Sequence, residues 1–332
     1  MPRVIGFGEV MLRLNPVGYR RLVQADCFEA SYAGCEANAL VTCANLGMDV
    51  AMVTKFPANE LGRAAAGELR RYGVDTRFVQ FDGPRLGVYF LETGASYRDS
   101  KVVYDRKGSS IALAKRSDFD WDAIFDGAEW FHYSGITPAL SDEMPAIHMD
   151  ALKAAKAKGL TVSCDINYRG KLWTAQKAGE VLTPMMEYTD VCAFNETEAT
   201  QVFGVKPEEG CDKYESLGRQ LTEKFGLRQV AVTLSDNATA DANRIGGFIY
   251  EGGKPYYSPL RDVHIIDRVG AGDCYTGALI WAALEGYDPQ HAVNFATAAC
   301  CLKCTEPFDF NHETFDEIEK LASGGGNGGP QR

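Results

Sequence analysis

One short segment, Gly270-Ala271-Gly272-Asp273, combines residue types that could act on a phosphate. It follows a predicted strand over 263–266 and opens a predicted helix over 273–285. Glycines let the backbone approach a ligand closely, and a helix N-terminus presents unpaired N–H groups and a partial positive charge to an anion. An aspartate there would repel a bound phosphate, so Asp273 is better explained as a general base that takes the proton of an attacking hydroxyl. The alternative is that Asp273 only caps the helix after a tight turn.

Acidic and amide groups recur in Asn195-Glu196-Thr197-Glu198, which follows a predicted strand over 190–194 and opens a predicted helix over 196–203. Asn195 can cap this helix, and Glu198 lies in its first turn. A carboxylate in that position can hold a hydrated Mg²⁺ through water. A capping box, in which Asn195 and Glu198 each bond the backbone N–H of the other, fits the same spacing. The spacing alone leaves both interpretations open.

Two arginines could recognise a carboxylate. Arg106 follows Tyr104, and Arg169 lies shortly after a predicted strand over 160–165. The carboxyl ends of such strands are where α/β proteins build their sites. A guanidinium group can bind a carboxylate with two parallel hydrogen bonds, which a neutral sugar would not require. Each arginine taken alone could equally form a surface salt bridge.

The elements that must position these residues follow a simple order. Predicted strands alternate with predicted helices over most of the chain, which is typical of a parallel sheet with crossover helices. The alternation is interrupted at about 11–33 and 86–107, where β-rich pieces follow one another without helices. Those strands would form a small antiparallel sheet that projects from the main domain. We therefore expect one α/β domain over 1–322 and a glycine-rich, flexible tail over 323–332.

Several motifs resemble those of one known family. The segment 267–279 resembles the C-terminal signature of the ribokinase-like (PfkB) carbohydrate kinases, and 195–198 resembles their NxxE element. Gly34 and Asn38 resemble the family's N-terminal sugar-binding turn. The resemblance covers nearly the whole chain and implies a three-layer αβα domain with a small β-sheet lid, acting with ATP and Mg²⁺. It implies a catalytic turn of Gly270, Ala271, Gly272 and Asp273 with Asp273 as the base, nucleotide contacts from Asn195, Thr233, Ser235, Gly270 and Gly272, and a metal-associated Glu198.

The lid and the strand ends also bear on the substrate. Tyr89, Tyr104, Arg106 and Arg169, together with the segment 132–140, resemble the 2-keto-3-deoxygluconate kinases of this family. This resemblance implies transfer of the γ-phosphoryl group of ATP to the 6-hydroxyl of that sugar acid. A fructokinase or another neutral-sugar kinase of the family, or a non-catalytic sugar-binding descendant, is the alternative. The implied substrate contacts are Gly34, Asn38, Tyr89, Tyr104, Arg106, Arg169 and Asp309.

Composition limits the partners. The net charge of −11 disfavours a general nucleic-acid surface, which needs a basic stripe. No apolar run reaches the ~18 residues of a membrane span, and the N-terminus lacks the features of a signal peptide, so we expect a cytoplasmic protein. Cys300, Cys301 and Cys304 have no second CxxC to partner them, which favours core packing over metal binding. An exposed lid sheet would favour pairing of chains into a homo-oligomer.

Overall fold

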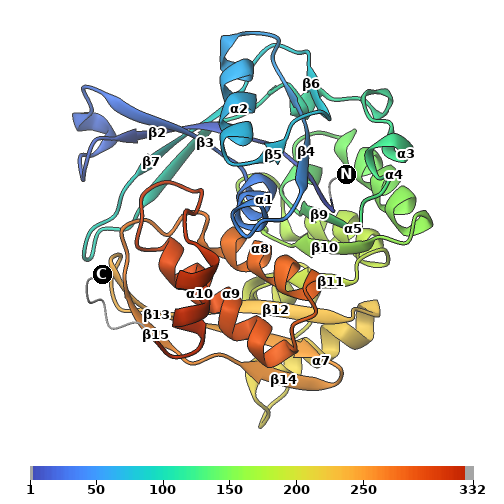
Figure 1. Ribbon diagram of the computed structural model, residues 1–332, viewed down its shortest axis with the longest axis vertical. Helices are drawn as coiled ribbons and strands as arrows, with labels where there is room; N and C mark the ends of the chain where they lie inside the picture. The colour runs from blue at the N-terminus through green and yellow to red at the C-terminus, as the bar shows by residue number, and fades with distance from the viewer. Residues whose placement is uncertain (1–2, 326–332) are drawn as a thin grey trace.

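The computed structural model describes residues 3–325 and contains a large central sheet covered by helices (Figure 1). The strand order is β14-β13-β12-β11-β10-β9-β1-β4-β5, with β15 paired to β13 and β6 to β4. The strands from β4 through β1, β9, β10 and β11 to β12 pair in parallel, and β13 begins an antiparallel extension. The bounds are β1 Val4–Phe7, β4 Val50–Phe56, β5 Val74–Asp75, β6 Val79–Phe81, β9 Trp130–Ser134, β10 Thr161–Asp165, β11 Val191–Ala193, β12 Gln229–Asn237, β13 Ala242–Glu251, β14 Lys254–Tyr257 and β15 Arg261–His264.

Successive residues of the parallel strands enter two separate cores. Val50 and Met52 of β4 pack on one side of the sheet, and Ala51 and Val53 pack on the other. All of β4 is buried, as expected of a parallel strand covered on both faces. Helices α1, α2, α8, α9 and α10 cover one face, and α3 to α7 cover the other. This arrangement confirms the predicted αβα layers.

The helices that form these outer layers include α6 and α8, which agree with the predicted helices over 196–203 and 273–285 to within a few residues. Their bounds are α1 Cys35–Asn45, α2 Glu60–Arg71, α3 Trp121–Ile124, α4 Met144–Ala157, α5 Ala175–Met186, α6 Glu196–Gln201, α7 Lys213–Phe225, α8 Ala271–Leu284, α9 Pro289–Lys303 and α10 Phe315–Ala322. Short 3₁₀ turns lie at Leu22–Gln24, Ile111–Leu113, Arg116–Asp118 and Thr137–Ala139.

A second sheet, the lid, projects to one side of the main sheet (Figure 1, blue and teal strands at the left). Its order is β3 (Phe28–Ala33), β2 (Met11–Pro16), β7 (Gly87–Glu92) and β8 (Lys101–Asp105). The prediction of a purely antiparallel lid was wrong, because β2 and β7 pair in parallel. β2 follows β1 and β7 follows β6, and both preceding strands run parallel to β4. The chain therefore enters the lid both times from the carboxyl ends of parallel strands in the main sheet.

The end of the described chain is held against α10. Gly324 and Gly325 donate their N–H groups to the carbonyls of Leu321 and Lys320. The remainder of the predicted flexible tail, 326–332, lies outside the described residues. No helix within residues 3–325 combines the length and the apolar character needed to cross a bilayer. All ten cysteines lie in the described part as free thiols, and those at 300, 301 and 304 are buried, as predicted.

Candidate active site

The two glycines of the turn before α8 differ in their surroundings. Gly270 has φ +85°, a left-handed conformation that favours glycine. A Cβ on Gly270 would lie 2.2 Å from the carbonyl oxygen of Asp309, so no larger residue fits without a shift. Gly272 faces open space, because a Cβ there would meet no described atom within 4 Å apart from its chain neighbours and the backbone of its own helix. Helix α8 begins at Ala271, so the backbone N–H groups of the turn form its N-terminus.

This turn forms one wall of a cavity of about 450 Å³. The other walls come from the carboxyl ends of β10 and β11, from β12 and from lid strand β8, which is the usual location of sites in α/β sheets. The predicted site residues that line the cavity are Tyr104, Arg169, Asn195, Glu198, Thr233, Gly270, Gly272 and Asp273. The residues Asp165, Asn167, Arg268 and Thr276 also line it and were not predicted as site residues.

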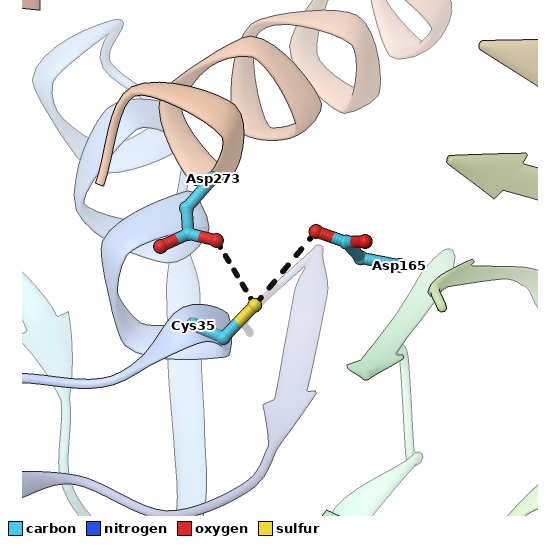
Figure 2. A group of neighbouring side chains, drawn as sticks. All are labelled: Cys35, Asp165 and Asp273. Carbon is cyan, nitrogen blue, oxygen red and sulfur yellow. Dashed lines mark hydrogen bonds between the residues drawn. The ribbon is translucent and has the colours of Figure 1, made fainter. Parts of the chain in front are cut away.

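Both oxygens of the Asp273 carboxylate meet hydrogen-bond donors. The Cys35 thiol donates to Oδ1 at 2.9 Å (Figure 2), and the side-chain amide of Asn38 donates to Oδ2 at 2.6 Å. Burial raises the pKa of Asp273, and the two hydrogen bonds oppose the rise. A carboxylate with a raised pKa accepts a proton more readily than an exposed one. Asn38 also accepts the backbone N–H of Gly34 at 3.3 Å, which ties the predicted sugar-binding turn to Asp273.

A second carboxylate, Asp165, ends β10 and faces the same thiol (Figure 2). Its Oδ2 lies 3.9 Å from the sulfur of Cys35, and one ligand atom from each of Cys35, Asp165 and Asp273 lies within 4.8 Å of the others. Burial, together with the nearby charges of Glu198 and Asp273, raises the pKa of Asp165 well above its ordinary value. This crowding of negative charge favours the presence of a cation. The position of Asp165 at the carboxyl end of a buried strand was the sequence signal for it.

Glu198 forms the capping box that the spacing allowed. Its Oε2 accepts the N–H of Asn195 at 2.8 Å, and Asn195 Oδ1 accepts the N–H of Glu198 at 3.0 Å. The other oxygen of Glu198 accepts the N–H of Tyr168 at 2.8 Å. Burial raises the pKa of Glu198 to about 7. Each carboxylate oxygen has two acceptor positions, so these bonds leave room for a water molecule of a hydrated cation.

The two predicted carboxylate-binding arginines lie in different environments. Arg169 is exposed and lines the cavity. Arg106 is buried, and its Nε donates to Oε2 of Glu9 at 2.7 Å. The hydroxyl of Ser109 donates to the other oxygen of Glu9 at 2.5 Å, so the Arg106 charge is neutralised inside a closed cluster. Arg106 also lies over the ring of Tyr104, 5.4 Å from its centroid.

A buried network joins the lid to the glycine turn. The Tyr89 hydroxyl donates to both oxygens of Asp309 at 2.8 Å. Arg13, on lid strand β2, bonds Asp309 at 2.5 Å and also bonds Asp267, the first residue of the glycine-turn signature. Asp267 in turn accepts the backbone N–H of Val269 at 3.0 Å. The sequence predicted Tyr89 and Asp309 as substrate contacts. In the structure their side chains are hydrogen-bonded to each other, and neither is among the residues that line the cavity.

A smaller cavity of about 210 Å³ adjoins the first. The two cavities share Thr233, Arg268 and Gly272. Ser235 and Ala271 line only the smaller one. The predicted nucleotide contacts therefore divide between two adjoining cavities, with Asn195 in the larger one and Ser235 in the smaller one. Gly34 lies outside both, and a Cβ there would be 2.0 Å from the carbonyl oxygen of Glu9, which explains glycine at that position.

Comparisons with known proteins agree with this geometry. The 2-dehydro-3-deoxygluconokinase of Thermotoga maritima has a crystal structure that matches with a TM-score of 0.95 at 49% identity, covering 97% of this chain and 98% of that one. The 2-dehydro-3-deoxygalactonokinase of Haloferax volcanii is 30% identical over 98% of both chains. Fructokinase-1 of Oryza sativa subsp. japonica is 28% identical over 91% of this chain and 92% of that protein. Because a model of the pfkB family carbohydrate kinases matches residues 1–309, the chain belongs to that family.

Proposed function

We propose that this chain is an ATP-dependent kinase that phosphorylates the 6-hydroxyl of 2-keto-3-deoxygluconate, also called 2-dehydro-3-deoxygluconate. The observation that carries the proposal is the position of Asp273. It lies in the first turn of α8, beside the open Gly272, and its carboxylate has donors on both oxygens. The likeness to the Thermotoga maritima enzyme, at 49% identity, supports the choice of sugar acid.

In this mechanism the Gly270–Asp273 backbone amides bind the oxygens of the transferred phosphoryl group, where the helix dipole also favours negative charge. Asp273 accepts the proton of the 6-hydroxyl while the sugar oxygen forms its bond to the γ-phosphorus. The bond from that phosphorus to the β,γ-bridging oxygen breaks, and ADP leaves. Most of the catalysis would come from positioning and from charge stabilisation, as is usual for phosphoryl transfer.

Mg²⁺ is part of the proposal, and the acidic side chains of the cavity suit it. Mg²⁺ prefers oxygen ligands and is commonly held by one or two carboxylates together with substrate phosphates. Glu198 and Asp165 both line the cavity, and burial raises the pKa of each carboxyl, with the nearby charges of Glu198 and Asp273 adding to the rise at Asp165. When bound, the ion would neutralise phosphate charge in a cavity that already holds several carboxylates. The protein has a net charge of −11, so a bound cation would also reduce the repulsion between the protein and ATP.

We assign recognition of the sugar-acid carboxylate chiefly to Arg169. It is exposed and lines the cavity, whereas Arg106 is paired with Glu9. Arg106 could reach the substrate only by leaving Glu9 unpaired, and an unpaired buried carboxylate is costly. Arg106 therefore acts on this site through the ring of Tyr104, which lines the cavity and lies beneath its guanidinium.

A coupled assay of ADP formation tests the function and its alternatives. The substrates are 2-keto-3-deoxygluconate, its galactonate epimer, fructose and ribose, each with ATP and Mg²⁺. We expect the sugar acids to be phosphorylated and Asp273→Asn to lose most turnover while it still binds ATP. Faster turnover of fructose would favour a fructokinase, near-normal activity of Asp273→Asn would refute the base, and no ADP with any sugar would favour a non-catalytic sugar-binding protein.

The carboxylate contact needs its own test. Arg169→Ala should raise the KM for the sugar acid by at least tenfold, because a charge-assisted bond contributes about 1.5–3 kcal/mol. The matched control is Arg116→Ala, which removes an exposed arginine paired with Asp150 outside the cavity. If Arg169→Ala weakened a neutral sugar to the same extent, the carboxylate contact would be wrong.

The outer face of the lid supports a proposed homo-oligomer. The strand register places Leu12, Leu14, Tyr32 and Phe90 on one face, where Leu12 and Tyr32 pack against the main core of the chain. Farther along the same face Phe28 is exposed, and the rings of Phe28 and Phe90 pack edge to face with centroids 5.7 Å apart. An apolar sheet face of this kind is typical of a surface that another chain covers. A second copy of the chain is the proposed occupant of this face. The proposed location of the protein is the cytoplasm, where ATP is available.

Light scattering after gel filtration tests the assembly. Phe90→Lys should reduce the molar mass, because a buried unpaired ammonium disfavours the contact. Leu61→Lys, at an exposed apolar position on α2, serves as the control. An unchanged mass for both variants would remove the lid from the interface.

A further inference from the structure

Two thiols stand one helical turn apart at the end of α9, and phosphoryl transfer as described above makes no use of them. Cys300 and Cys304 are both buried, and the backbone N–H of Cys304 bonds the carbonyl of Cys300 at 3.3 Å. Interaction between their side chains raises the pKa of Cys300 and lowers that of Cys304. The sequence pattern favoured simple core packing for this cluster, and the neighbouring Cys301 fits that description.

The place of this pair in the fold differs from that of an ordinary core thiol. Cys300 and Cys304 line the smaller cavity of about 210 Å³, together with Thr233 and Ser235. That cavity shares Gly272 with the larger one, at the helix N-terminus where the phosphates of ATP are proposed to bind. The two thiols therefore lie beside the proposed nucleotide, in a cavity whose lining residues include none from the lid.

We propose that Cys304 is a thiol modification site whose adduct blocks the nucleotide cavity and which bound ATP protects. The idea rests on the proposed function, since ATP is the ligand that would cover the site. The chemistry is thiol–disulfide exchange with a small dialkyl disulfide. The sulfur of Cys304 attacks one sulfur of the reagent, a new S–S bond forms as the reagent's own S–S bond breaks, and the departing thiolate takes a proton from water.

The surroundings of Cys304 select it over the other buried cysteines. Interaction with the Cys300 side chain, together with the positive charges of Lys303 and Arg268, lowers the pKa of Cys304 despite burial and the opposing charge of Asp267. Burial raises the pKa of Cys301 to about 12. The thiolate is the attacking species in exchange, so Cys301 should react far more slowly at neutral pH. Cys304 also lines the smaller cavity, whereas Cys301 is not among the residues that line it.

The experiment starts from a Cys27→Ser/Cys211→Ser parent, because those two cysteines are exposed and would react first. The parent is treated with 2-hydroxyethyl disulfide, and the modified peptides are identified by mass spectrometry. We expect labelling of Cys304 with parallel loss of kinase activity, recovery with dithiothreitol, and at least tenfold slower labelling in saturating ATP. The sugar acid alone should not slow it.

Matched variants separate this site from general thiol damage. Adding Cys304→Ser to the parent should abolish the sensitivity of its remaining activity to the reagent, whereas Cys301→Ser on the same helix should leave the sensitivity in place. Label on Cys301 or Cys35 instead of Cys304, or equal labelling with and without ATP, would overturn the site. If the untreated parent formed no ADP with any sugar, the proposed function would fail instead, so the two failures are distinguishable.

Discussion

Removing the amide donor of Asn38 should move the pH dependence of the reaction by a measurable amount. The Asn38 side chain donates to Asp273 Oδ2 at 2.6 Å, and the Cys35 thiol donates to Oδ1. Both bonds favour the ionised carboxylate and so lower its pKa, while burial raises it. In Asn38→Ala one of the two opposing interactions is lost, and the pKa of Asp273 must rise further.

The size of the shift follows from the type of bond. A hydrogen bond to a charged group contributes about 1.5–3 kcal/mol, and one pKa unit corresponds to about 1.4 kcal/mol, so the expected rise is about 1–2 units. The base works only when ionised, so activity is lost as the pH falls through its pKa. The acidic limb of the pH profile should therefore move to higher pH in Asn38→Ala. In the unsubstituted enzyme that limb should already lie above the value of 3.8 for an ordinary aspartate.

The assay is kcat/KM for 2-keto-3-deoxygluconate across a pH series. Asn45→Ala is the matched control, because Asn45 lies on the same helix and donates its amide at 2.6 Å to the carbonyl of Asn311 instead of to a carboxylate. Asn38→Asp is a second variant. It keeps an acceptor for the N–H of Gly34 and places a like charge beside Asp273, so its limb should also move upward. An acidic limb that stayed in place in both Asn38 variants would refute Asp273 as the titrating base.

Three further substitutions test how the structure supports the site. Gly270→Ala should lower the free energy of unfolding by about 1–3 kcal/mol through strain and overlap, and Gly286→Ala, with φ +75° and open space, should cost less in the same urea titration. Arg13→Met should cost about 3–5 kcal/mol, because two buried carboxylates lose their cation, whereas Arg20→Ala, in an exposed pair, should change little. Burial raises the pKa of Glu36 to about 7, so the unfolded chain binds fewer protons between about pH 4.5 and 7. The melting temperature should therefore rise as pH falls through that window, and Glu36→Gln should weaken this dependence.

The layers of the fold could be predicted from the sequence because the patterns that indicate each strand and helix lie within short segments of the chain. β4 begins with four apolar residues, Val50 to Val53, and the helical segments carry their own caps, such as Asn59 before α2 and Asp288 before α9. The parallel pairing of β2 with β7, by contrast, could not be predicted from local signals. It joins strands about 75 residues apart, and their own residues are compatible with either direction. The parallel direction of this pairing follows because the chain enters both strands from the carboxyl ends of parallel strands in the main sheet.

Within the site, what could be predicted depended on whether a residue's partner was near in sequence. The capping box of Asn195 and Glu198 was visible as a spacing of three residues. The pairing of Arg106 with Glu9 was not, because the partners are separated by 97 positions and either could have been solvated. An arginine next to a tyrosine looks the same in sequence whether its charge is available to a ligand or already neutralised. Burial and the distant partner make that difference, and neither is a local property.

Gly270 and Gly272 stand in the same turn for different physical reasons. Gly270 is required by packing, since its missing Cβ would overlap the carbonyl of Asp309, and Asp309 is fixed by Arg13 and Tyr89 from the lid. Its presence would be explained even if nothing bound at the turn. Gly272 has no such neighbour among the described residues, and the space that a side chain would fill is part of both cavities. Gly272 and Asp273 are therefore the residues that support phosphate binding at this helix N-terminus. Gly270 is explained by the packing of the lid network against the turn.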